Sequence, residues 1–174
     1  MTEINIRPEI PLEYENICGL VKTAFETAHV SSGEEANLVR NIRGGLNYIP
    51  ELSLVAERDG VLIGQVMLSK TTVTNENDVF PTLFLGPVCT LPEYRNKGLG
   101  GALINAALAK AKDMGHTAVF LAGDRNYYRR FGFVSASEHR IRCQHELPPE
   151  LLDNVMALEL TPDALKGVAG IVTL

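Results

Sequence analysis

A glycine-rich turn between two apolar segments is the feature that most limits how this 174-residue chain can fold. The apolar run of residues 83–91 leads into the turn, and an Ala- and Leu-rich segment leads out of it and stops at Gly115. A short apolar run, a turn and a long apolar segment in this order predict a strand, a tight turn and a helix. The turn itself carries residues 95–101, which read RNKGLGG.

This turn has the chemistry of an anion site. Glycines let the backbone approach a ligand without Cβ atoms in the way, and the first amides of the following helix have no partners within that helix. Those amides and the positive end of the helix dipole favour a phosphate or a pyrophosphate. Arg95 and Lys97 add positive charge at the same place. The sequence therefore predicts a phosphate-binding turn.

Three phosphate-binding patterns compete for the turn. A Walker-type P-loop requires G-x-x-x-x-G-K-[ST], but Lys97 precedes Gly98 and no Ser or Thr follows. A dinucleotide fingerprint requires Gly or Ala three residues after Gly100, where Leu103 stands. The remaining pattern is [R/Q]-x-x-G-x-[G/A], which Arg95, Gly98 and Gly100 match. A plain glycine-rich turn before a well-formed helix stays open as an alternative.

A second motif follows one predicted helix and one predicted strand later. Residues 123–133 read GDRNYYRRFGF, in which Tyr128, Gly132 and Phe133 match the pattern Y-x-x-x-G-F. The two motifs in this order resemble the GNAT superfamily of N-acetyltransferases, and the second resembles one bacterial branch known only as predicted N-acetyltransferases. The resemblance is firm over about residues 52–136 and looser over the N-terminal helices.

The resemblance implies a fold and a donor. It implies a single GNAT domain over residues 1–174, of α/β (α+β) class, with a central mixed, mostly antiparallel sheet whose parallel strands splay apart between flanking helices. The donor it implies is acetyl-CoA, without a metal, with pantetheine in the wedge between the splayed strands. Pro87 fits such a wedge, because a residue without an N–H sits at an edge or a bulge of a sheet. The implied CoA-binding residues are Val88, Cys89 and Thr90 on the strand and Arg95, Asn96, Lys97, Gly98, Leu99, Gly100 and Gly101 in the turn.

The chemistry of the donor points to further residues. An amine that attacks the thioester drives negative charge onto the carbonyl oxygen, which a backbone N–H of residues 88–90 could stabilise. The leaving thiolate then needs a proton, and the resemblance places Tyr128 there as general acid; the alternative is that Tyr128 only packs or positions CoA. The base for the amine stays open between Glu57, Glu93, His116 and ordered water. A further alternative is a covalent acyl-enzyme formed on Cys89. We expect instead that Cys89 is a small buried apolar side chain without a catalytic role.

Periodicity and turn signals predict the remaining elements. Asp59 and Gly60 predict a hairpin between strands at residues 52–58 and 61–74. Ser32 and Glu35 have the spacing of a capping box and predict the start of a helix over residues 34–42. Asp124 predicts the N-cap of a short helix. We also expect helices at residues 14–25 and 98–114 and strands at residues 4–7, 79–91, 117–122 and 154–160, the last as the final strand near the acceptor site.

The sequence does not name the acceptor, so polyamine, aminoglycoside, amino acid, peptide N-terminus and protein lysine all stay open. Glu26, Glu34 and Glu35 either attract a cationic acceptor or belong to a solvated loop. Arg129 and Arg130 either reach the 3′-phosphate of CoA or face solvent. The rival from another class is a non-catalytic CoA-binding sensor, which would use the same turn. A nucleotide-binding domain is a further rival.

Composition limits the compartment and the partners. A net charge of −5 argues against nucleic acid as the main partner. We expect no membrane span, because the longest apolar runs fall short of the ~18 residues that one requires, and no signal-peptide start. Three cysteines without CxxC spacing predict a reducing, cytoplasmic setting, with neither a disulfide framework nor a zinc site. The resemblance also makes a homodimer a possible assembly.

Overall fold

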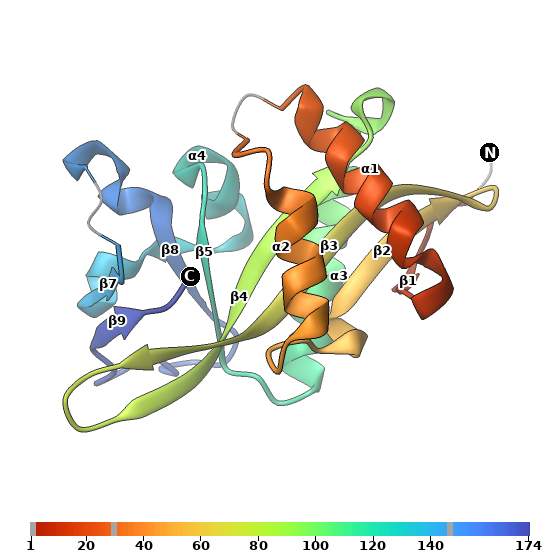
Figure 1. The fold of residues 1–174 in the computed structure, drawn as a ribbon. Helices are drawn as coiled ribbons and strands as arrows, with labels where there is room; N and C mark the ends of the chain where they lie inside the picture. Colours follow the sequence, from red (N-terminus) through yellow and green to blue (C-terminus); the bar gives the residue numbers. More distant parts are fainter. Residues whose placement is uncertain (1–2, 29–30, 146–147) are drawn as a thin grey trace. The chain divides into compact units, whose positions relative to one another are not determined.

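The computed structural model describes residues 3–28, 31–145 and 148–174. Contacts divide the chain into two compact units, the first made of Met1–Ser69 and Gly86–Lys110 and the second of Lys70–Leu85 and Ala111–Leu174. Strands β3 (Val61–Thr74) and β4 (Val79–Thr90) and helix α3 (Leu99–Asp113), labelled in Figure 1, each have residues in both units. The strands form a mixed sheet, as predicted. The prediction of a single domain stays a prediction.

The first unit carries an antiparallel sheet. β1 (Asn5–Pro8) pairs with β2 (Ser53–Arg58), and β2 pairs with β3. Asp59 and Gly60 join β2 to β3 with φ angles of 53° and 77°, the left-handed region that a tight hairpin turn needs at both central residues. The predicted hairpin is therefore confirmed. Pro8, which we expected to lie beyond the first strand, is its last residue, as an edge strand allows.

Helices α1 (Tyr14–Glu26) and α2 (Glu35–Gly44) cover one face of this sheet. Their inward side chains form a buried cluster with strand residues, made up of Ile17, Leu20, Val21, Ala24, Val39, Val55, Met67 and Cys89. Helix α3 contacts the other face, because a Cβ on Gly64 would stand 2.9 Å from Cδ1 of Leu103. Gly64 and Met67 are three residues apart in β3, and side chains at odd spacing point to opposite faces.

A buried ion pair joins α2 to the segment that follows β1. The side chain of Glu9 is 0% exposed and that of Arg43 is 6% exposed. Nε and Nη2 of Arg43 donate to the two carboxylate oxygens of Glu9 at 2.7 and 2.6 Å, and the Tyr48 hydroxyl donates to Oε1 at 2.9 Å. A buried charge pair is tolerated only when both charges are matched and hydrogen-bonded. This pair therefore fixes the position of α2 against the end of β1.

The start of α2 follows the capping-box prediction with one change. Oε1 of Glu35 accepts a hydrogen bond from the backbone N–H of Ser32 at 2.7 Å. The Ser32 hydroxyl accepts from the N–H of Glu34 at 3.2 Å, one residue earlier than a capping box requires. The N-cap residue of α2 is Glu34, without a side-chain cap hydrogen bond, so the prediction that Ser32 caps this helix is wrong.

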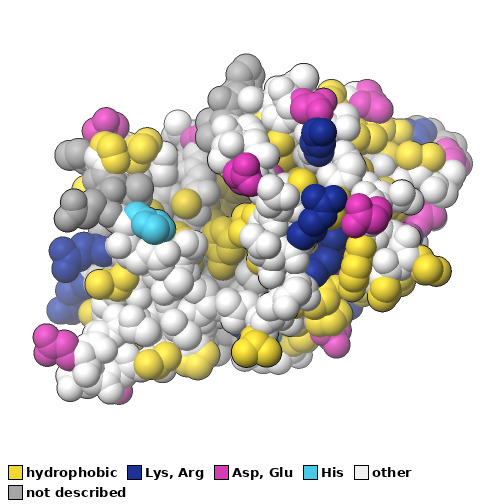
Figure 2. Space-filling model, in the orientation of Figure 1, with side chains coloured by type: hydrophobic (Ala, Val, Ile, Leu, Met, Phe, Trp, Pro, Cys, Tyr) yellow, Lys and Arg dark blue, Asp and Glu magenta, His cyan; other side chains and the backbone are white. Residues whose placement is uncertain are grey.

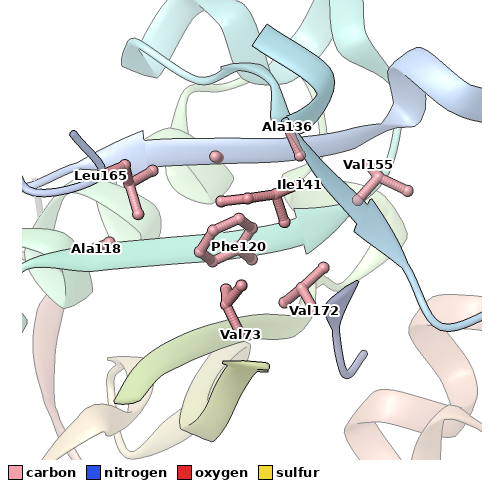
Figure 3. Close-up of a cluster of buried hydrophobic side chains, with 9 residues drawn as sticks. Val73, Ala118, Phe120, Ala136, Ile141, Val155, Leu165 and Val172 are labelled. Atoms are coloured by element: carbon pink, nitrogen blue, oxygen red, sulfur yellow. The ribbon is translucent and has the colours of Figure 1, made fainter. Parts of the chain in front are cut away.

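The second unit is built around β5 (Ala118–Ala122). β5 runs parallel to β4 and antiparallel to β8 (Val155–Glu159), which also pairs with the short β6 (Val134–Ser135). β7 (Ile141–Cys143) runs parallel to β9 (Gly170–Val172), and β9 pairs with the end of β3. Figure 3 shows the ring of Phe120 among buried side chains that include Val73, Ile141 and Val172. The apolar run of β5 thus forms the core of this unit.

Short helices complete the described chain. The α4 helix spans Arg125–Tyr128. Short 3₁₀ helices occupy Pro11–Glu13, Pro50–Leu52, Pro92–Tyr94, Arg129–Phe131, Ala136–His139 and Pro149–Asn154. Within residues 3–28, 31–145 and 148–174, no helix has both the length and the apolar character that crossing a membrane requires.

The strand predicted at residues 154–160 is confirmed as β8, but the expectation that it is the final strand is wrong. β9 follows it and pairs with β7, and neither of these strands was predicted from the sequence. Gly170 explains how β9 approaches β3, because a Cβ there would stand 2.2 Å from the carbonyl oxygen of Thr74. Its φ of 144° also favours glycine. The placement of residues 154–160 near an acceptor stays a prediction.

Candidate active site

The turn between β4 and α3 has the conformation that an anion-binding loop requires. Asn96 and Gly98 have φ angles of 58° and 82°, so two residues of the turn adopt the left-handed conformation before the helix begins. The carbonyl oxygen of Gly98 accepts from the N–H of Ala102 at 3.0 Å, which starts the helical ladder of α3. Asn96, Lys97 and Gly98 are exposed. The first turn of α3, all of it described, carries no acidic residue that would repel a phosphate.

The two cations of the turn occupy different surroundings. The guanidinium of Arg95 donates to the backbone carbonyl oxygens of Ala24 and Thr27, the latter at 3.2 Å, at the end of α1. Its charge therefore also stabilises the negative end of that helix. The ammonium of Lys97 lies 5.8 Å from the ring centroid of Tyr94 and is exposed. Lys97 is consequently the more available of the two charges for an anion in solution.

Strand β4 leads into this turn with Val88, Cys89 and Thr90. Cys89 is buried within the cluster beneath α1, and burial raises the pKa of its thiol to about 12. A thiol that stays protonated is a poor nucleophile, which favours the small buried side chain over a covalent acyl-enzyme. β3 passes close by, because a Cβ on Gly64 would stand 3.1 Å from the carbonyl oxygen of Cys89.

The pairing of β4 with β5 is short. It joins Leu83 to Val119 and Phe84 to Phe120, and no further pair follows within the described strands. The parallel register therefore ends before Gly86 and Pro87, where the sequence predicted that the strand parts from a neighbour. The roles of residues 88–90 toward a ligand stay predictions.

Tyr128 ends α4 in the second unit. Asp124 caps this helix as predicted, because its Oδ1 accepts from the N–H of Asn126 at 2.8 Å. The Tyr128 ring lies edge-on to Tyr127 and to Phe133, with centroids 5.0 and 6.0 Å away. Burial, with smaller effects from Tyr127 and Asp124, raises the pKa of Tyr128 above its ordinary value. The hydroxyl is therefore protonated at neutral pH and can donate a proton or a hydrogen bond.

The three candidate bases differ in what surrounds them. Glu57 accepts from Nε and Nη2 of Arg7 at 3.0 and 2.6 Å, which marks it as a structural ion-pair partner. Glu93 is exposed in a 3₁₀ turn. His116 is half-buried, and burial together with the charge of Lys70 lowers its pKa, so its imidazole is neutral at pH 7. A neutral imidazole can accept a proton, as a carboxylate can, so the identity of the base stays open.

A cavity of about 390 Å³ lies between α1 and α2. Glu35 lines it and accepts hydrogen bonds from Ser31 and Ser32. Partial burial acts to raise the pKa of Glu35, but those hydrogen bonds and its own backbone N–H outweigh burial and leave the pKa lowered. Glu26 also lines the cavity. Glu34 instead accepts from the side chain of Asn37 at 2.6 Å.

Basic side chains, which were not predicted from the sequence to lie here, share this cavity. Lys22 and Arg40 line it together with Glu26 and Glu35, so its rim carries both signs of charge. Figure 2 shows Lys and Arg side chains beside Asp and Glu side chains over α1 and α2. The spacing of Lys22 and Glu26, one helical turn apart, was the available signal.

A second cavity, of about 410 Å³, lies in the second unit. Arg125 and Arg129 line it, and Arg125 pairs with Asp153 at 2.7 Å. Arg130 instead covers the face of the Tyr127 ring, with its guanidinium carbon 4.2 Å from the centroid. Arg129 and Arg130, which are neighbours in the sequence, therefore have different surroundings.

Comparison with known proteins identifies the family to which the chain belongs. Residues 5–136 match the family described as "Acetyltransferase (GNAT) domain", which covers both motifs. The chain belongs to the GNAT acetyltransferase family. It is 35% identical over 170 residues to the "Uncharacterized N-acetyltransferase YhbS" of Escherichia coli strain K12, across 96% of this chain and 93% of that protein. As a GNAT protein, the chain is an acetyl-CoA-dependent acyltransferase.

Two solved GNAT structures resemble the fold over its whole length. The crystal structure of YhbS from Escherichia coli in complex with CoA has a TM-score of 0.87 at 32% identity, over 99% of this chain and 90% of that one. A GNAT acetyltransferase from Brucella melitensis in complex with acetyl-CoA has a TM-score of 0.78 at 28% identity, over 99% and 96%. The predicted GNAT fold class is therefore confirmed.

Proposed function

We propose that this GNAT protein transfers the acetyl group of acetyl-CoA directly to the amine of an acceptor still to be identified. The observation that best supports the donor is the turn before α3, with Gly98 in the left-handed region, exposed backbone and no acidic residue in the helical turn that follows. Two similar proteins have been solved with CoA or acetyl-CoA. In this proposal residues 95–101 bind the pyrophosphate and residues 88–90 run along the pantetheine.

The reaction follows from the donor. The acceptor nitrogen forms a bond to the acetyl carbon while the carbon–sulfur bond breaks, and the nitrogen loses a proton to water or a base. A backbone N–H among residues 88–90 stabilises charge on the carbonyl oxygen. Tyr128 gives its phenolic proton to the CoA thiolate and regains one from solvent. The Tyr128 hydroxyl is protonated at neutral pH, so a proton is available for the thiolate, although the raised pKa makes it a weaker acid than a free phenol.

The test of the Tyr128 role is a comparison of two neighbouring tyrosines. Tyr128→Phe removes the proposed acid and should lower kcat on the order of 10²–10⁴-fold. Tyr127→Phe is the matched control, because it removes a hydroxyl from the same short helix without removing the acid. Calorimetry should give similar dissociation constants for acetyl-CoA in both variants. A kcat for Tyr128→Phe equal to that of Tyr127→Phe would contradict general-acid catalysis and leave a packing role.

The rival function is a CoA-binding sensor without catalysis. Such a sensor would bind CoA through the same residues 95–101 as the enzyme, but it would not acetylate an amine. Tight acetyl-CoA binding without acetylation of any amine would favour the sensor.

We also propose a cytoplasmic location and a homodimer. The location is supported by the three free cysteines at positions 18, 89 and 143, all within the described residues. The dimer rests on family resemblance alone. Light scattering at micromolar concentration tests it, with a monomer mass as the contradicting result.

A further inference from the structure

Gly123 stands where β5 gives way to α4, and its backbone is held on both sides. Its N–H donates to the carbonyl oxygen of Asn154 at 2.9 Å, which ties it to the start of β8. The next residue, Asp124, accepts from the backbone N–H groups of Asn126 and Tyr128 at 2.8 and 3.0 Å. The backbone at Gly123 therefore has little freedom to move away from its surroundings.

The space that a side chain on Gly123 would need is filled by Tyr128. A Cβ built on Gly123 would stand 2.5 Å from Cε2 and 3.0 Å from Cδ2 of the Tyr128 ring, well inside van der Waals contact. Rotation about the Cβ–Cγ bond of Tyr128 would move these two atoms, but it would also change how the ring packs against its aromatic neighbours. The ring is also confined by the edges and faces of Tyr127, Phe131 and Phe133.

We propose that Gly123 is a positioning residue for Tyr128: the missing side chain lets the ring lie against the backbone and so sets where the phenolic hydroxyl points. This inference rests on the proposed role of Tyr128 as proton donor. Gly123 touches neither substrate nor donor in the proposal. It acts through the ring, and any side chain at position 123 displaces the hydroxyl.

The test introduces one methyl group at Gly123 and a matched methyl group elsewhere. Gly123→Ala should lower kcat on the order of 10–100-fold, because a misplacement of about 1 Å costs roughly that much. Calorimetry should give an unchanged dissociation constant for acetyl-CoA. Gly19→Ala is the control, because a Cβ at Gly19 meets nothing within 4 Å. It should leave kcat within about twofold of the native value.

A double variant separates positioning from a general structural effect. In a Tyr128→Phe chain there is no hydroxyl to misplace, so adding Gly123→Ala should change kcat by less than about twofold. Equal falls in kcat with and without the hydroxyl would overturn the proposal. If Tyr128→Phe itself has native kcat, the proton-donor role fails first, and that result is distinct from failure of the Gly123 proposal.

If Gly123→Ala folds too poorly for kinetics, melting temperatures test the proposed contact between position 123 and the Tyr128 ring. Tyr128→Ala removes the ring that the new methyl group meets. Gly123→Ala should therefore lower the melting temperature of the native chain but not that of the Tyr128→Ala chain. A similar loss of melting temperature in both chains would overturn the proposed contact.

Discussion

Nη2 of Arg95 donates a hydrogen bond to the backbone carbonyl oxygen of Ala24, in the last turn of α1. The same guanidinium reaches the carbonyl oxygen of Thr27. The first residue of the glycine-rich turn at residues 95–101 thus also caps the C-terminal end of α1. A cation at a helix C-terminus satisfies carbonyl groups that have no partner within the helix.

Arg95 and Lys97 should therefore respond differently to truncation. Arg95→Ala should lower the free energy of unfolding by about 1–3 kcal/mol, because charged hydrogen bonds to α1 are lost. Lys97→Ala should leave stability nearly unchanged and instead weaken acetyl-CoA binding more at low salt than at high salt, because its charge is exposed. Denaturant unfolding and calorimetry at two salt concentrations measure these effects. Equal destabilisation by the two substitutions would contradict the assignment.

The buried pair of Glu9 and Arg43 should be far more sensitive to substitution than the exposed pair that Arg40, also on α2, makes with Glu15 on α1. Arg43→Met leaves the carboxylate of Glu9 buried without its cation and should cost about 3–5 kcal/mol. Arg40→Met is the matched control. Arg40 pairs with Glu15 at 3.3 Å with both side chains at least half exposed, so its loss should cost at most about 1 kcal/mol. Comparable losses in urea unfolding would show that the Glu9 pair is not buried in solution.

The thiol of Cys89 should be protected from alkylation in the folded protein. Its pKa of about 12 keeps it protonated, and its side chain is buried. Iodoacetamide at pH 8 should modify the half-buried Cys143 first, and Cys89 only after unfolding. Peptide mass spectrometry identifies the modified position. Rapid native-state labelling of Cys89 would reopen the covalent mechanism.

The same pKa predicts how Cys89 affects stability at high pH. The unfolded thiol loses its proton near pH ~8.5, whereas the folded thiol keeps it up to about pH 12. Between these values the folded state binds more protons, so the free energy of unfolding falls as pH rises. Cys89→Ala should show a shallower fall between pH 8.5 and 10.

His116 should produce the opposite dependence at low pH. Burial and the charge of Lys70 lower its pKa, so the unfolded chain takes up a proton first as pH falls below ~6.5. The contribution of His116 to stability is thus present above pH 6.5 and is lost as pH falls toward its folded pKa. His116→Asn should flatten this part of the stability profile between pH 7 and 5. An unchanged slope would mean that the imidazole is no less basic in the folded protein than in the unfolded chain.

Local chemistry made part of this structure predictable from sequence. Asp59 and Gly60 specify their hairpin because both positions need positive φ, and Asp124 specifies a helix start because its carboxylate satisfies a free N–H. The turn at residues 95–101 was predictable from the spacing of its glycines and from the apolar helix that follows it. These features depend on residues within a few positions of one another, so a single sequence carries their signal.

Contacts between distant residues were not predictable. β7 and β9 have three residues each, too few for a periodic pattern, and their partners lie about thirty residues apart. The hydrogen bonds of Arg95 reach α1 about seventy residues earlier in the chain, although the motif suggested only a phosphate contact. The space that Gly123 leaves for Tyr128 could not be predicted from the sequence either, because it depends on where the Tyr128 ring packs in the folded chain.

The most direct test of the whole account is acetyl transfer itself. The purified protein is incubated with acetyl-CoA and a panel of a polyamine, an aminoglycoside, free amino acids, a peptide and a lysine-rich protein, and each mixture is analysed by mass spectrometry and for free CoA thiol. We predict one class of acceptor that gains an acetyl group in equal amount to the CoA released. Failure to bind acetyl-CoA or CoA at all would contradict the assignment of the turn at residues 95–101 and the proposed function with it.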